Sequence, residues 1–176
     1  MNQYNKTTRF FAAVLVIGGV VGVFNIAWVI YSGFGLRYFR PEGPDKNGVE
    51  LWLIFFAGMY IWALVTGLLS WQGTPYGRRW VLNLFASQIP APILPILKFQ
   101  WFTGAQCTVF LGEGTSWNGS DILNFVVSFG AGFAARFCCG RLDEYGIGVN
   151  LFALLAVVLL VAARKRLRAT RAAEVF

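Results

Sequence analysis

The sequence predicts an all-α membrane protein with a small β element: a four-helix transmembrane bundle with an extracytoplasmic β-hairpin-like insert between its third and fourth helices. Of the 176 residues, 57% are apolar or aromatic and only 13% are charged, against roughly 25% charged in soluble domains. The apolar residues form four long runs without an internal charge. Each run approaches the ~20 residues that a helix needs to cross a bilayer.

The first two predicted spans are residues 10–31 and 51–71. Hydrocarbon offers no hydrogen-bonding partners to a backbone, so each run is expected to be helical throughout. The two helices also contain small residues at helical spacing. Such residues let two backbones approach closely, either within the bundle or between subunits. The predicted helix-packing positions are Gly18, Gly22, Ala63 and Gly67.

The third predicted span, residues 80–97, contains three prolines in its second half. Each proline removes a backbone donor and disturbs the preceding turn, so this helix is expected to kink or unwind near residue 89. An opened helix can form an apolar pocket with a few oriented polar groups. The candidate lining residues of a pocket for an apolar ligand are Asn83, Gln88 and Pro90.

The predicted outer insert, residues 98–144, is too apolar to be disordered. Apolar residues alternate along residues 123–137 and, less regularly, along residues 99–111. This period of two is typical of β-strands and predicts a hairpin. The alternative is a fifth spanning helix over residues 122–138.

Three cysteines, Cys107, Cys138 and Cys139, lie in this insert. An oxidising compartment would permit one disulfide, between Cys107 and one member of the adjacent pair. The pair lacks the C-x-x-C spacing of redox motifs, and a metal site of three cysteines is not expected.

The fourth predicted span, residues 145–163, precedes a basic tail, residues 164–176. Basic residues near the ends of spans favour the cytoplasmic side. With both termini in the cytoplasm, nine of the fifteen basic residues lie inside, in short flanks: Lys6, Arg9, Arg78, Arg79, Arg164, Lys165, Arg166, Arg168 and Arg171. The sequence therefore predicts a multi-pass protein of the cell membrane as one integral domain, with both termini cytoplasmic.

The net charge of +7 does not predict nucleic-acid binding, because the basic residues flank the apolar runs. The chain has no histidine, so it cannot itself supply histidine-ligated haem or a histidine base, and no cofactor is expected. The predicted spans contain no ionisable aspartate, glutamate, lysine or arginine, which argues against a proton pump. Their notable polar residues, expected to form hydrogen bonds between helices, are Asn25, Thr66, Asn83, Ser87, Gln88 and Asn150.

We therefore expect a non-catalytic subunit or scaffold of a larger membrane complex, whose partners are the lipid bilayer and other membrane protein subunits. The large aromatic surface is more than one small bundle can bury. The alternatives are a carrier of an apolar ligand, such as a lipid or a quinone, and a small membrane enzyme.

Overall fold

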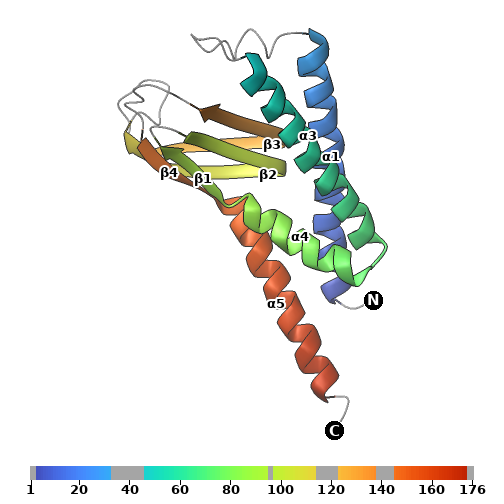
Figure 1. Cartoon of the computed structure of the whole chain (residues 1–176). Coiled ribbons are helices and arrows are strands. Elements are labelled where there is room, and N and C mark those ends of the chain that lie inside the picture. The colour runs from blue at the N-terminus through green and yellow to red at the C-terminus, as the bar shows by residue number, and fades with distance from the viewer. Residues whose placement is uncertain (1–2, 33–45, 95–96, 114–122, 138–144, 174–176) are drawn as a thin grey trace.

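The computed structural model describes residues 3–32, 46–94, 97–113, 123–137 and 145–173 (Figure 1). Four helices pack with a four-stranded antiparallel sheet. The helices are α1 (Gln3–Ser32), α3 (Lys46–Trp71), α4 (Pro75–Ser87) and α5 (Leu151–Ala173). The strands are β1 (Pro90–Leu94), β2 (Leu97–Glu113), β3 (Leu123–Phe137) and β4 (Tyr145–Asn150), in the sheet order β1-β4-β2-β3.

The expected four-helix transmembrane bundle is wrong, and the fold is mixed α/β. Both of the later predicted spans, residues 80–97 and 145–163, divide into a helical part and a strand. α4 ends before Pro90, and β4 precedes α5. The two strands then pair with each other, with Pro90 opposite Val149. β1 also pairs with the start of β2 through Ile93 and Leu94. Pro90 and Pro92, in contrast, pair only with β4. Prolines are tolerated at strand positions that are paired on one side alone, because a backbone N–H on the open side needs no ladder partner.

Two helical segments, Lys6–Ser32 and Leu51–Trp71, are long and apolar enough to cross a membrane. The core helix of a soluble protein or an N-terminal signal sequence also meets this criterion of length and composition. The outward faces of both helices are apolar as well, with exposed Phe24 and Trp28 on α1 and exposed Ile54 and Leu68 on α3. Helices that are apolar on all sides belong in a core or in a membrane.

The predicted hairpin is confirmed. β2 and β3 pair in one continuous register from Leu97 opposite Phe137 to Leu111 opposite Leu123. Residues 123–137 are therefore a strand, and the alternative of a fifth helix is wrong. Gly104 and Gly130 lie opposite each other with φ of 86° and 110°, a conformation that residues with a Cβ rarely adopt.

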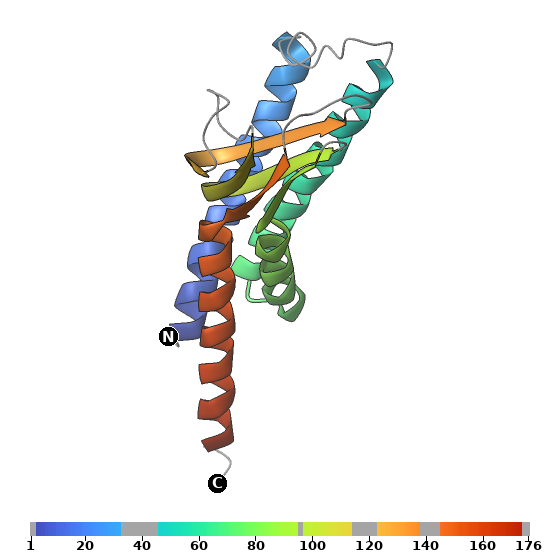
Figure 2. The same ribbon diagram turned by 90° about the vertical axis from the view of Figure 1, so that its left-hand side faces the viewer.

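The hairpin crosses α1 near the middle of that helix. A Cβ on Gly18 would lie 2.3 Å from the backbone nitrogen of Gly104, so the backbones of α1 and β2 touch at this point. Higher on α1, the Asn25 side-chain amide donates a hydrogen bond to the backbone oxygen of Ala131 on β3 (3.1 Å). Figure 2 shows the strands beside the upper part of α1 and α3. The hairpin thus packs against both helices.

Aromatic rings fill the space between α3 and the hairpin. The rings of Phe56 and Phe133 stack with centroids 4.3 Å apart, and the ring of Phe99 also stacks on Phe56, with centroids 5.8 Å apart. Trp101 is buried, and its indole donates to the backbone oxygen of Ser87 at the end of α4 (3.2 Å). This contact joins the helical part of the molecule to the sheet.

Helices α4 and α5 run from the sheet toward the end of the molecule that holds both termini and the α3–α4 turn (Figure 1). α4 has 13 residues, which gives a length of about 20 Å at 1.5 Å per residue. The apolar part of α5, residues 151–163, has a similar length. α4 and the apolar part of α5 are therefore each shorter than the roughly 30 Å hydrocarbon core of a bilayer.

Candidate functional site

The residues predicted to line an apolar-ligand pocket have different environments. Gln88 is buried, and its amide both donates to the Thr103 hydroxyl and accepts from the Thr103 backbone N–H, each at 3.0 Å. Asn83 and Pro90 are exposed. The polar groups of Gln88 are therefore engaged in joining the end of α4 to β2.

The four predicted packing residues make two kinds of contact. A Cβ on Gly22 would meet the ring of Tyr60, and one on Gly67 would meet the backbone oxygen of Ala12, so both glycines lie where α1 touches α3. Ala63 is fully buried. Gly18, in contrast, faces the strand β2.

Cys107 is a free thiol on β2, opposite Val127 of β3. The other end of the same hairpin pairs Leu97 with Phe137. Cys138 and Cys139 lie outside the described residues.

The sheet carries an apolar face that extends beyond the helices. Residues directly opposite each other in antiparallel strands share a face, as do alternate residues of one strand. The register therefore places six exposed side chains on one face, which we call the apolar sheet face: Leu111, Leu123, Phe125, Val127, Phe129 and Ile147. Phe129 is 85% exposed, whereas Phe133, on the same face, packs in the core. The helices thus cover the part of this face around Phe133 and leave the six exposed residues uncovered.

Strand β3 forms one end of the sheet, and no other described strand pairs with its outer side. Asn25 supplies a donor to this edge at Ala131. Sequence reasoning expected Asn25 to bond to another helix, and an apolar run alone contains nothing that indicates a strand as its partner. The alternation along residues 123–137 indicated an apolar face. It did not indicate which part of that face the helices cover.

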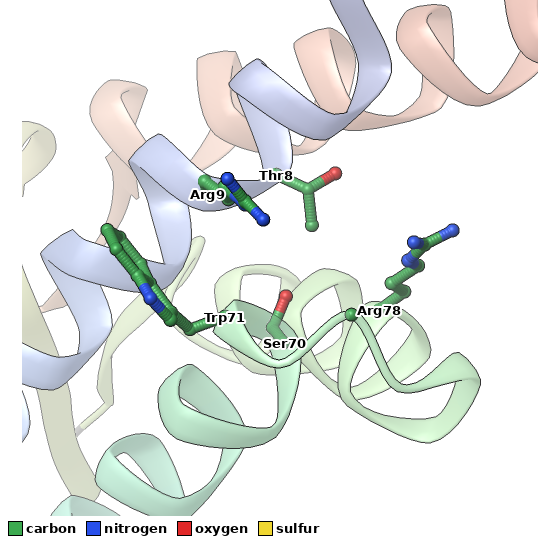
Figure 3. A pocket seen from close by; sticks show the side chains of 6 residues that line it. Thr8, Arg9, Ser70, Trp71 and Arg78 are labelled. Carbon is green, nitrogen blue, oxygen red and sulfur yellow. The ribbon is translucent and has the colours of Figure 1, made fainter. Parts of the chain in front are cut away.

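A small cavity lies where the start of α1 meets the α3–α4 turn (Figure 3). It measures about 50 Å³ and is lined by Thr8, Arg9, Ser70, Trp71, Gly73 and Arg78. We call it the basic pocket. Sequence reasoning used both arginines for orientation and did not place them together, because residues 9 and 78 are brought close only by the packing of α1 against α3 and α4.

Among the side chains that the structure places, no three of the types His, Cys, Asp or Glu gather as metal ligands would. Comparison with protein-family models, curated proteins and solved structures finds no match. The described residues thus offer two candidate sites, the apolar sheet face and the basic pocket.

Proposed function

We propose that the protein is a non-catalytic subunit of a membrane complex, anchored by α1 and α3 and docked to another membrane protein through the apolar sheet face. The observation that supports this proposal is the depth of the sheet along α1. Val14 and Asn25 both contact the hairpin. They lie eight residues after Lys6 and seven residues before Ser32, the ends of the candidate span.

These separations correspond to about 12 Å and 10 Å along a helix. If α1 crosses the bilayer, the hairpin beside it lies at the depth of the hydrocarbon. Strand edges are not tolerated there unless protein covers them, because their N–H and C=O groups have no partner in lipid. A neighbouring protein on the outer side of β3 meets this requirement and also covers the apolar sheet face.

We further propose that the protein resides in the cell membrane with both termini in the cytoplasm. The basic side chains of Lys6, Arg9, Arg78 and Arg79 belong to the end of the molecule at which α1 begins and α4 begins. Arg164, Lys165 and Arg166 belong to the second half of α5, and this helix runs toward the same end (Figure 1). Basic residues next to spans favour the cytoplasmic face.

A paired substitution tests the docking. Phe125→Ser with Phe129→Ser removes two rings that are 62% and 85% exposed, so the fold of the isolated chain is expected to persist. The protein is extracted from its native membrane in mild detergent, and the mass of the intact assembly is measured. We expect the unaltered chain to retain a stoichiometric membrane protein and the variant to lose it.

The matched control is Ile54→Ser, which removes a side chain that is 69% exposed on α3. Ile54 is two residues from Phe56, whose ring packs on the hairpin, and therefore lies on the opposite side of that helix. It is expected to keep the partner. An unaltered chain that emerges as a stable monomer, or equal loss of the partner in the control, contradicts the proposal. A photo-crosslinking residue at position 127 then shows whether the retained protein touches the sheet.

A further inference from the structure

The basic pocket is formed where the ends of three helices meet. Thr8 and Arg9 lie in the first turns of α1, Ser70 and Trp71 end α3, and Arg78 lies in the first turn of α4. The approach of α4 to α3 is close, since a Cβ on Gly77 would lie 2.5 Å from the backbone nitrogen of Ser70. The packing of the backbone therefore sets the shape of the pocket.

The wall of the basic pocket contains a buried hydroxyl, that of Ser70. Its side chain is only 2% exposed, and its hydroxyl oxygen has no hydrogen-bond partner in the structure. Serines in helices commonly donate back to a carbonyl of the preceding turn. The Ser70 hydroxyl instead points into the space between α1 and the turn, toward Thr8 and Arg9 (Figure 3). A buried hydroxyl without a partner is explained when a bound molecule supplies one.

Several hydrogen bonds are made within the turn itself. The carbonyls at the end of α3 accept hydrogen bonds within the turn: that of Leu69 from the Thr74 backbone N–H at 3.1 Å and from the Thr74 hydroxyl at 2.9 Å, and that of Ser70 from Gly73 at 3.0 Å. The Thr74 hydroxyl in turn accepts from the Gly77 N–H. These hydrogen bonds, together with the packing of Gly77 on Ser70, hold the shape of the turn that lines the basic pocket.

We propose that the basic pocket binds a phosphate group. Guanidinium groups present paired donors that match the oxygens of phosphate, and hydroxyls add further donors. The described lining carries two guanidinium groups, two hydroxyls and no carboxylate. A cavity of about 50 Å³ also exceeds the 10–15 Å³ of probe-occupied volume that a single water requires.

The phosphate has two possible sources, a phospholipid headgroup or a free phosphate ion. Trp71 is half exposed at the rim of the pocket, and tryptophan is enriched at the headgroup level of membranes. A headgroup as the source depends on the proposed membrane location, whereas the phosphate chemistry of the pocket does not. The experiment therefore has one arm for each source.

The protein is purified in an uncharged detergent. One arm titrates it with inorganic phosphate by calorimetry, and the other measures retained lipid by intact mass after transfer to bilayer discs of phosphatidylglycerol and phosphatidylcholine. Charge-assisted hydrogen bonds contribute enough that Arg78→Gln is expected to weaken binding about ten- to hundredfold. Arg79→Gln is the matched control, because Arg79 carries the same charge one residue away, is exposed and does not line the pocket.

Ser70→Ala provides a variant whose fold is not in question. Removing an unpaired buried hydroxyl is expected to raise the melting temperature of the phosphate-free protein and at the same time to weaken binding severalfold. Binding in the lipid arm alone assigns a headgroup, and binding in the phosphate arm extends the site to the free ion. The proposal is overturned if neither arm shows binding, or if Ser70→Ala and Arg78→Gln bind as Arg79→Gln does. Its failure would leave the docking proposal intact, because the apolar sheet face lies elsewhere.

Discussion

At the scale of single residues, close backbone contact between α1 and β2 depends on Gly18. Gly18→Ala places a Cβ 2.3 Å from the Gly104 nitrogen and 2.7 Å from the Thr103 carbonyl carbon, so backbone must move. Overpacking of this kind costs about 1–3 kcal/mol. We therefore expect a lower thermal unfolding temperature in detergent.

Gly58 on α3 provides the matched control, because a Cβ there has nothing within 4 Å. Gly58→Ala is expected to stabilise the protein by about 0.5–1 kcal/mol, since alanine restricts the unfolded chain and favours helix. Equal effects of the two substitutions would show that α1 and β2 are not in backbone contact.

At the scale of secondary-structure elements, the hairpin was predictable, and the division of two predicted spans into a helix and a strand was not. Apolar residues alternate over residues 123–137, and a β-strand is the only regular structure that places all of them on one face. Residues 80–97 and 145–163, in contrast, satisfy length and hydropathy for a span as well as for a helix joined to a strand. The difference depends on the pairing of Pro90 with Val149, 59 residues apart, which no local pattern reveals.

Asn150 holds the junction between β4 and α5. Its side-chain oxygen accepts from the backbone N–H groups of Phe152 (3.2 Å) and Ala153 (3.4 Å), at the start of α5, and of Cys107 on β2 (3.2 Å). Asn150→Ala leaves these donors unpaired and removes a helix cap, with an expected cost of about 1–3 kcal/mol in the free energy of unfolding. Asn150→Asp keeps the acceptor and is expected to cost less. Denaturant titration followed by circular dichroism measures both, and an alanine variant as stable as the unaltered chain would contradict this role.

At the scale of the whole molecule, the depth of the sheet decides whether a protein partner is required. The expectation from sequence was an insert outside the membrane, where water satisfies the strand edges. The contact of the hairpin with α1 at Val14, Gly18 and Asn25 instead places the sheet beside the middle of a candidate span. In water, the backbone groups on the outer side of β3 form hydrogen bonds with solvent. In hydrocarbon they have no such partner, so a neighbouring protein must cover them.

A nitroxide label distinguishes the two positions. The background is a chain in which the three native cysteines are serine. Val127→Cys labels the apolar sheet face, Ile61→Cys labels an exposed position in the middle of α3, and Tyr76→Cys labels an exposed position at the start of α4. In lipid discs we expect the label at position 127 to collide with oxygen, which concentrates in hydrocarbon, as often as the label at position 61 does. Position 76 is expected to favour a water-soluble nickel complex. If position 127 behaves as position 76 does, water satisfies the edge of β3, and the physical need for a protein neighbour disappears.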